Sequence, residues 1–304
     1  MKIGFFPGCS LHGTGKEYGE SLQAITVPLG IELAEIRDWA CCGATSAHAT
    51  NHLLGIALPA RTLAQAEEEK HGEVLAPCAA CYSRLAAARD EIAHDPTLAQ
   101  RVNGILGKPF ANSVAVLNIV DLLVKMAPVI KQKTTHPLTG MKVASYYGCL
   151  LVRPPKVTNC AEFESPQVME EVVRATGATP VEWPKKLDCC GGGFSLARSA
   201  SVVRLGREIL ENARSAGADV LLVACPMCQS NLDMRQQAMS RRSTKPFDMP
   251  ILYITQLVGM ALGCDSKSLG LGRHFVSTAP ATKFMAAAST PAAHTNQPTA
   301  TKEA

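Results

Sequence analysis

The sequence has no basic tract, no membrane-length apolar run and little net charge. A net charge of +4 over 304 residues, without a Lys/Arg-rich run, does not indicate a nucleic-acid partner. The longest apolar stretch, ILYITQLVGMALG at 251–263, is shorter than the roughly 20 residues that span a bilayer, and we expect it to be a packed helix. The opening MKIGFFPGC lacks the apolar core of a secretory signal. We therefore expect a cytoplasmic protein without a transmembrane segment.

What the chain does have is cysteine. It contains 12 of them, and 47% of its residues are hydrophobic, enough for a sizeable core. In the reducing compartment expected here, disulfide frameworks are rare, and metal binding or redox chemistry is the commoner use of clustered cysteines. The cysteines are therefore interpreted as ligands.

Short apolar segments alternate with longer helical ones, and the order occurs twice. Strands are predicted at 2–6, 31–36, 73–77, 142–147, 178–183 and 219–224, with helices at 15–29, 51–70, 166–176 and 195–216. This pattern predicts an α/β fold of two tandem, related βαβ-type repeats with parallel sheets. The expected domains are 1–140, including a connecting helix at 116–130, and 141–265. The Ala/Thr/Ser/Pro-rich stretch 266–304 is predicted to be a disordered tail.

Ten of the cysteines follow the same duplicated order. A single cysteine is followed by Cys-Cys-Gly and then by Cys-x-x-Cys, first with gaps of 31 and 35 residues and then with gaps of 39 and 34. Neighbouring residues agree as well, since PGCSL corresponds to YGCLL and PCAACYSRL to CPMCQSNL. This recurrence favours an internal duplication.

Each cysteine group follows a predicted strand, where loops of a parallel sheet converge on a ligand crevice. A closed zinc site or an ordinary cubane iron–sulfur cluster takes four ligands, whereas each repeat offers five thiols. The surplus favours an enlarged or open iron–sulfur cluster. Three alternatives remain: one spare buried thiol per repeat, a pair of structural zinc sites, or a dithiol exchange motif. Cys160 and Cys264 lie outside the pattern and are expected to be ordinary thiols.

The motif resembles the paired cysteine-rich CCG domains in the B subunit of the heterodisulfide reductase family, over residues 1–263. FPGCSLHGTGKEY, WACCGATSAHATNHL, LAPCAACYSRL, SYYGCLLVRPP and VACPMCQSNLDMRQ are similar to the bacterial branch of that family. The resemblance implies a noncubane [4Fe–4S] cluster in each repeat. The implied ligands are Cys9, Cys41, Cys42, Cys78 and Cys81 for the first cluster, and Cys149, Cys189, Cys190, Cys225 and Cys228 for the second.

The resemblance also implies an activity and partners. A disulfide would be cleaved between the two clusters with electrons from the iron–sulfur C subunit together with the flavin A subunit, so the chain would be the catalytic subunit of an oxidoreductase complex. Related domains occur in succinate, fumarate, glycolate and lactate oxidoreductases, where they pass electrons towards quinone or attach the complex to a membrane. That electron-transfer role is the main rival, and a zinc-stabilised scaffold is a third hypothesis.

Histidines near the first Cys-Cys-Gly are candidates for proton transfer, since imidazole titrates near neutral pH. His48 is the preferred catalytic candidate, because the second repeat has Leu196 at the matching position. His12 and His52 are further candidates. Roles at a helix surface or cap are the alternative for all three.

Overall fold

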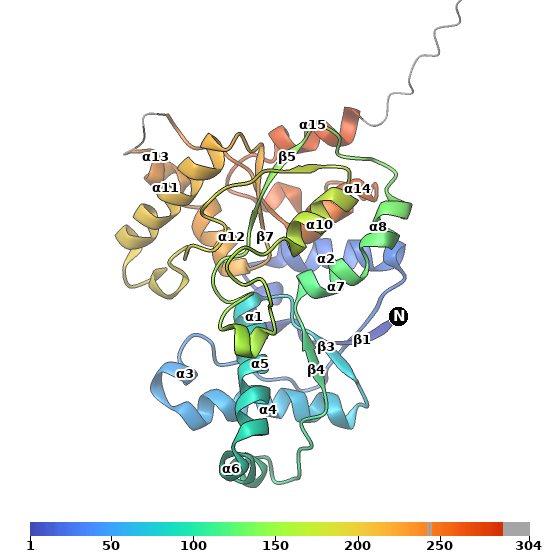
Figure 1. Cartoon of the computed structure of the whole chain (residues 1–304), viewed down its shortest axis with the longest axis vertical. Helices are drawn as coiled ribbons and strands as arrows, with labels where there is room; N and C mark the ends of the chain where they lie inside the picture. The colour runs from blue at the N-terminus through green and yellow to red at the C-terminus, as the bar shows by residue number, and fades with distance from the viewer. Residues whose placement is uncertain (242, 244, 288–304) are drawn as a thin grey trace, which may run out of the picture.

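The structure, a computed structural model, describes residues 1–241, 243 and 245–287. It contains two four-stranded parallel sheets, with strand orders β2-β1-β3-β4 and β6-β5-β7-β8. The first sheet lies in the blue-to-green lower part of the molecule and the second in the upper part (Figure 1). The prediction of an α/β fold with two related parallel-sheet repeats is therefore confirmed.

The two sheets have equivalent strands in equivalent places. The first consists of β1 (Lys2–Phe5), β2 (Glu32–Glu35), β3 (Glu73–Leu75) and β4 (Ala115–Leu117). The second consists of β5 (Lys142–Tyr146), β6 (Thr179–Pro180), β7 (Val220–Val223) and β8 (Ile251–Tyr253). All four residues of β7 are buried, as expected for an interior strand of a sheet covered on both faces.

The fourth strand of each sheet corrects the sequence prediction. Residues 116–130 and 251–263 are not continuous helices, because each segment begins in a short strand, β4 or β8. Helix α7 (Ile119–Lys125) starts only after Asn118, whose side chain caps it by accepting from the N–H groups of Val120 and Asp121. Helix α14 (Ile254–Ala261) likewise follows directly on β8. A three-residue strand joined to an apolar helix gives one unbroken apolar run, which hides the boundary.

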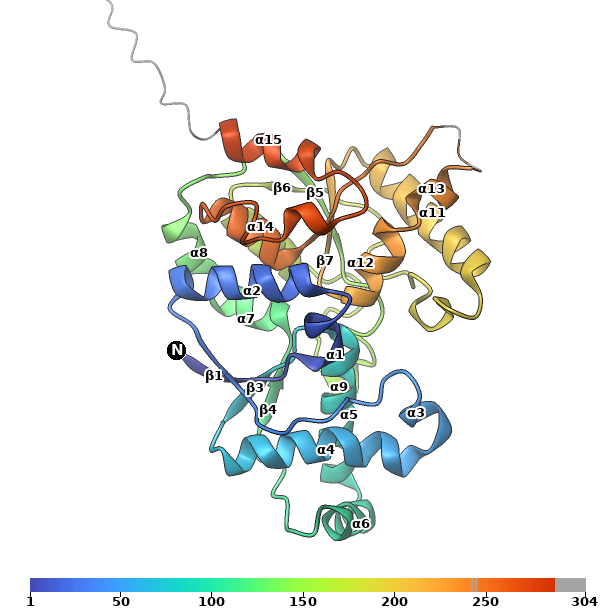
Figure 2. The same ribbon diagram turned by 180° about the vertical axis from the view of Figure 1, so that it is seen from behind.

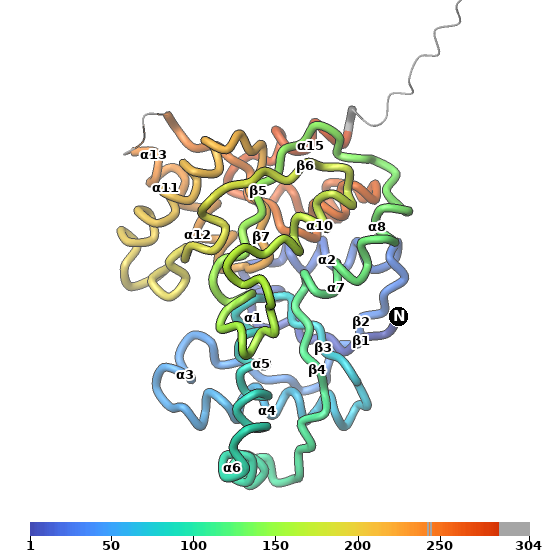
Figure 3. Tube along the Cα trace, in the orientation of Figure 1, coloured from blue at the N-terminus to red at the C-terminus, as the bar shows by residue number. Residues whose placement is uncertain are grey.

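Helices cover the sheets and connect their strands. In the first half these are α1 (Gly8–His12), α2 (Lys16–Leu29), α3 (Ala47–Thr50), α4 (His52–Glu68), α5 (Ala79–His94), α6 (Pro96–Leu106), α7 and α8 (Ala127–Lys133). The second half has α9 (Pro155–Thr158), α10 (Val168–Ala175), α11 (Ser199–Ser215), α12 (Pro226–Asp233), α13 (Gln236–Ser240), α14 and α15 (Ala279–Ala287). The tube trace shows the green α7 and α8 running up beside α10, which they contact (Figure 3).

Helices α2 and α9 also contact the opposite half. Helix α2 follows β1 in sequence, yet it packs against α14 beside the second sheet (Figure 2). In this contact the Ser21 and Thr255 hydroxyls are buried and lie 2.6 Å apart. In the opposite direction, α9 of the second half contacts α5 of the first. The two repeats therefore share parts of their packing.

The stretch after residue 265 is partly folded, which differs from the predicted disordered tail. Leu269 and Leu271 are buried, and Arg273 forms an ion pair with Glu20 of α2. The rest of the predicted tail, 288–304, lies outside the described residues. Composition obscured this folded part, because only a few apolar side chains anchor it.

Among the described residues, no helix combines the length and apolar character that crossing a bilayer requires.

A buried ion pair supports the loop that carries the second Cys-Cys-Gly. The Lys186 ammonium lies 2.9 Å from the Glu170 carboxylate, and their side chains are 7% and 0% exposed. Tyr147 also donates its hydroxyl to Glu170. The Lys186 carbonyl in turn accepts from the backbone N–H groups of Tyr147 and Gly148, at 2.9 and 3.2 Å. The pair thus ties the Cys-Cys-Gly loop to the end of β5.

Replacing Lys186 should destabilise the protein strongly. Lys186→Met would leave the Glu170 carboxylate buried without its cation, which typically costs about 3–5 kcal/mol of unfolding free energy. Urea unfolding followed by circular dichroism measures this loss. Lys185→Met is the matched control, because Lys185 pairs with Asp188 at the surface, where ion pairs contribute little. Equal midpoints for the two variants would contradict the role given to the buried pair.

Candidate functional site

The predicted ligand cysteines follow the carboxyl ends of strands in both halves. Cys9 lies in α1 directly after β1, and Cys78 is the N-cap residue of α5 directly after β3. In the second half Cys149 follows β5, and Cys225 is the N-cap residue of α12 after β7. Because the strands of each sheet are parallel, these residues gather at one sheet edge, where α/β folds bind ligands.

Within each half, the Cys-Cys-Gly loop meets the Cys-x-x-Cys turn. The sulfur atoms of Cys42 and Cys81 lie 3.3 Å apart, and those of Cys190 and Cys228 lie 3.5 Å apart. The same pair of motif positions is therefore in contact in both repeats. The first cysteine of each adjacent pair is separately in contact with a backbone N–H group of its own loop.

That backbone contact depends on a glycine. The Gly43 N–H lies 3.5 Å from the Cys41 sulfur, and the Gly191 N–H lies 3.3 Å from the Cys189 sulfur. Both glycines have positive φ, +76° and +81°, which side-chain-bearing residues rarely adopt. The glycine of each Cys-Cys-Gly thus turns a donor towards a sulfur, the kind of contact that tunes iron–sulfur sites.

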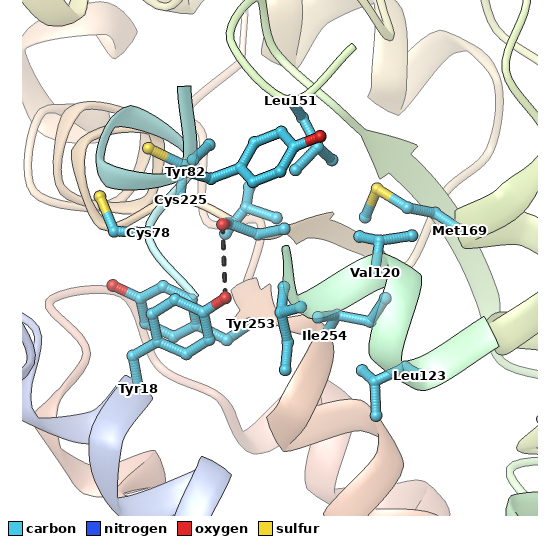
Figure 4. Close-up of a cluster of buried hydrophobic side chains, with 14 of the residues drawn as sticks. Tyr18, Cys78, Tyr82, Val120, Leu123, Leu151, Met169, Cys225, Tyr253 and Ile254 are labelled. Carbon is cyan, nitrogen blue, oxygen red and sulfur yellow. Dashed lines mark hydrogen bonds between the residues drawn. The ribbon is translucent and has the colours of Figure 1, made fainter. Parts of the chain in front are cut away.

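The two halves meet at their Cys-x-x-Cys turns. Hydrogen bonds with Cys228 and with Cys78 lower the pKa of Cys225, and the contact with Cys225 raises the pKa of Cys78 well above its usual value. Cys78 belongs to the first repeat and Cys225 to the second, so the Cys-x-x-Cys turns of the two repeats lie side by side. Figure 4 shows both cysteines in one buried cluster with Tyr18, Tyr82 and Tyr253.

Burial divides the thiols into an inner and an outer group. Cys42, Cys78 and Cys81 of the first repeat are buried, and so are their counterparts Cys190, Cys225 and Cys228. The outer thiols are Cys9, Cys41 and Cys189, which are exposed, and Cys149, which is half-buried. The site therefore has a water-shielded interior and an accessible rim.

The thiols that contact one another differ in pKa. The hydrogen bond with Cys81 lowers the pKa of Cys42 to about 7 despite burial. In the second half, the hydrogen bond with Cys149 lowers the pKa of Cys189 to about 5 and raises that of Cys149 itself. The thiols with lowered pKa values are therefore Cys42 in the first half and Cys189 and Cys225 in the second. The thiolate is the form of cysteine that binds metals.

A second pair of glycines, absent from the sequence-based predictions, sits against the inner thiols. A Cβ placed on Gly8 would lie 2.8 Å from the Cys81 sulfur, and one on Gly148 would lie 3.3 Å from the Cys228 sulfur. Both residues also have positive φ, +63° and +65°. Each glycine directly precedes the first cysteine of its repeat, and this duplicated position in the sequence was a signal that could have found them.

The second half has an additional donor near its thiols. The buried Asn231 amide lies 3.3 Å from the Cys190 carbonyl and 3.8 Å from the Cys190 sulfur, and the Ser195 hydroxyl donates to its oxygen at 2.9 Å. The matching residue of the first repeat is Arg84. Periodicity gave no reason to select Asn231, because its role depends on which way the start of α12 faces.

The three candidate histidines lie in different surroundings. His48 in α3 is exposed, and its Nδ1 lies 3.3 Å from the carbonyl oxygen of Gly43, next to Cys42. His12 stacks on Trp39 with ring centroids 6.1 Å apart. His52 pairs with Glu91 at 2.8 Å, so its contact is with α5 instead of the thiols. Of the three, His48 has the direct backbone contact with the Cys-Cys-Gly loop.

The cysteines outside the duplicated pattern lie elsewhere. Cys264 is half-buried and its sulfur is 3.7 Å from the Ala24 carbonyl oxygen, in the packing of α2. Cys160 is half-buried in the loop after α9, and burial raises its pKa.

The donors at the site suit iron or zinc, although they contact one another in pairs. Among the residues that the structure describes, no three His, Cys, Asp or Glu side chains converge as a preassembled metal site. The fit is chemical: each repeat supplies five thiols, at least one of them with a lowered pKa, and a backbone N–H group directed at sulfur. Thiolates of this number and softness are ligands for iron–sulfur clusters.

Several known proteins are similar in sequence to this chain over most of its length. The 8-methylmenaquinol:fumarate reductase membrane anchor subunit of Wolinella succinogenes is 33% identical over 278 residues, 90% of this chain and 97% of that protein. The B subunit of the ferredoxin/F(420)H(2)-dependent CoB-CoM heterodisulfide reductase of Methanosarcina acetivorans is 29% identical, covering 90% and 94%. The B subunit of the ferredoxin:CoB-CoM heterodisulfide reductase of Methanosarcina mazei is 30% identical with the same coverage.

The fold also occurs in a solved structure. A hypothetical protein from Helicobacter pylori superposes with a TM-score of 0.75 at 12% identity. The match covers 91% of this chain and 52% of that one, so the present chain spans about half of its length. The cysteine-rich domain family CCG matches twice, at residues 3–86 and 143–233. The chain therefore belongs to the CCG cysteine-rich domain family and is a homologue of the B subunit of heterodisulfide reductase.

Proposed function

We propose that the chain is the catalytic iron–sulfur subunit of a heterodisulfide reductase-type complex. The observation that carries the proposal is that the buried Tyr18 hydroxyl bonds to the carbonyl oxygens of Pro77 and Ala224, which places Cys78 and Cys225, the residues that follow them, side by side. Homology to heterodisulfide reductase subunits over 90% of the chain supports it. The partners proposed are the iron–sulfur C subunit together with the flavin A subunit of such a complex.

In this proposal the two cysteine sets hold two noncubane [4Fe–4S] clusters. Cys9, Cys41, Cys42, Cys78 and Cys81 would hold one cluster, and Cys149, Cys189, Cys190, Cys225 and Cys228 the other. When bound, such clusters supply the two electrons that reductive cleavage of a disulfide consumes. Two protons complete the balance and give two thiols. Reversal of the same reaction forms the disulfide.

The protein's own residues have separate roles in this proposal. The buried inner thiols keep water away from the centre of the site, which strengthens electrostatic interactions there. The accessible rim at Cys9, Cys41 and Cys189 leaves a way in for a thiol conjugate or an electron-donating partner.

We assign proton delivery to His48. If Nδ1 carries a hydrogen, it donates to the Gly43 carbonyl, which leaves Nε2 to hold or release a proton beside the first Cys-Cys-Gly. The side chain is exposed, so it can exchange protons with solvent.

A second candidate function rests on the similarity to the Wolinella protein, the membrane anchor subunit of an 8-methylmenaquinol:fumarate reductase. In that case the chain would pass electrons between a quinol and a partner and would cleave no disulfide. A zinc-stabilised scaffold is the remaining alternative, because cysteine thiolates also bind zinc.

Metal content separates iron from zinc. Anaerobically purified protein should contain about eight irons per chain, and Cys42→Ser should lower this by roughly half because one of two sites loses a ligand. Elemental analysis and EPR provide the measurement. Cys264→Ser is the control, since Cys264 lies outside the pattern, and its iron content should match that of the unchanged chain. Stoichiometric zinc with no iron would exclude both redox functions.

Substrate choice separates the two redox functions. The reduced complex should be reoxidised by CoB-CoM heterodisulfide or another mixed thiol disulfide, with release of two thiols per two electrons. Stopped-flow absorbance of the iron–sulfur bands and thiol titration measure this reaction. If a menaquinone analogue reoxidises the complex while every disulfide leaves it reduced, the electron-transfer role replaces the proposal.

The glycines beside the inner thiols provide a test of the ligand assignment. Gly8→Ala places a methyl group against the Cys81 sulfur and should lower iron content by up to half, through the first site alone. Gly30→Ala is the matched control: Gly30 has a similar φ, +67°, but a Cβ there meets no atom within 4 Å. The two variants carry the same backbone strain, so equal iron content in both would show that the Gly8 contact is irrelevant to the site.

A further inference from the structure

A single buried hydroxyl group connects the Cys-x-x-Cys turns of the two repeats. Tyr18 of α2 is fully buried, and its hydroxyl lies 3.0 Å from the Pro77 carbonyl oxygen and 3.3 Å from the Ala224 carbonyl oxygen. Pro77 directly precedes Cys78, and Ala224 directly precedes Cys225. One O–H group is therefore shared between matching backbone positions of the two repeats.

The Tyr18 ring is held in place by a second tyrosine. The rings of Tyr18 and Tyr253 stack with centroids 4.1 Å apart and planes 8° from parallel (Figure 4). The buried Tyr253 hydroxyl makes no hydrogen bond with either Cys-x-x-Cys turn among the described residues. Burial raises the pKa of the neighbouring Glu17, and the Tyr253 hydroxyl partly offsets that rise. The two tyrosines thus have similar burial, but only the Tyr18 hydroxyl bridges the repeats.

The helix that carries Tyr18 is seated on the second repeat. Beyond the Ser21–Thr255 contact, a Cβ on Gly259 of α14 would lie 3.3 Å from Cγ2 of Ile25, so the two helices pack closely. At the start of α2, a Cβ on Gly15 would lie 3.4 Å from both Pro226 Cβ and the Tyr253 hydroxyl. The helix that carries Tyr18 is therefore held by the second repeat, while the Tyr18 hydroxyl bonds to both repeats.

We propose that Tyr18 is a positioning residue that sets the separation of the two Cys-x-x-Cys turns, and with it the separation of the two redox sites. The redox part of this statement rests on the proposed function. The duplicated pattern places Thr158 at the position that matches Tyr18, nine residues after the first cysteine of its repeat. The second repeat therefore has no tyrosine at the position equivalent to Tyr18.

Tyr18→Phe is the decisive variant, because it keeps the stacked ring and removes only the bridging oxygen. Hydrogen–deuterium exchange of the full chain should show roughly fivefold to tenfold faster exchange in both turn segments, 78–82 and 225–229, since a buried hydrogen bond contributes about 1–1.5 kcal/mol. Tyr253→Phe is the matched control, and we expect little change in either segment. Reduced holoprotein should also show weaker spin coupling between the two sites by EPR in Tyr18→Phe than in Tyr253→Phe.

The outcomes distinguish the Tyr18 clamp from general stability and from the proposed function. Faster exchange throughout the chain, or equal effects of the two variants, would overturn the clamp. So would unchanged EPR coupling in iron-loaded Tyr18→Phe. If the protein contains zinc instead of iron but both turns still loosen together, the clamp stands and the proposed function falls.

Discussion

The site depends on the two Cys-x-x-Cys turns lying side by side, with Cys78 on one turn and Cys225 on the other. Parallel strands place every cysteine group of a repeat at one sheet edge, but two such edges have to face each other before cysteines of different repeats become neighbours. Helix contacts between the halves make this possible. Helix α2 of the first half packs on α14 of the second, and α9 of the second half packs on α5 of the first. The Tyr18 hydroxyl then joins the two backbones one residue before Cys78 and Cys225. The sheets, the helices and the Tyr18 side chain together therefore determine how the cysteines are arranged.

The two repeats have the same order of cysteines, but the surroundings of those cysteines differ. Within the adjacent pair, the cysteine with the lowered pKa is the second one in the first repeat, Cys42, and the first one in the second repeat, Cys189. Asn231 approaches the sulfur of Cys190, and the first repeat has an arginine at that position. Since donors to sulfur and nearby burial set the potential of an iron–sulfur site, the two sites are expected to be chemically unequal.

Local sequence patterns were sufficient to predict the two repeats. They were insufficient to predict the contacts between the repeats. Strand β7 and helix α11 follow from period and composition, and the cysteine spacing placed ten thiols at strand ends. Strands β4 and β8 were missed because each is three residues long and runs into a helix. Tyr18 was missed for another reason: it bonds to residues 59 and 206 positions away, and no local pattern encodes such a distance. Leu269 and Leu271 were also missed, since both are buried although they lie in a stretch with few apolar residues. His48 remains a prediction.

The crossing of α2 also bears on how such a protein could arise. Tyr18 and Ile25 are buried against the partner repeat, so a solitary first repeat would expose this apolar surface to water. A one-repeat ancestor with the same helix would therefore have needed a second copy to cover it. Gene fusion would then have made permanent an association that already existed between separate chains. After such a fusion the sequences of the two halves could diverge, because each half would always pack against the same partner.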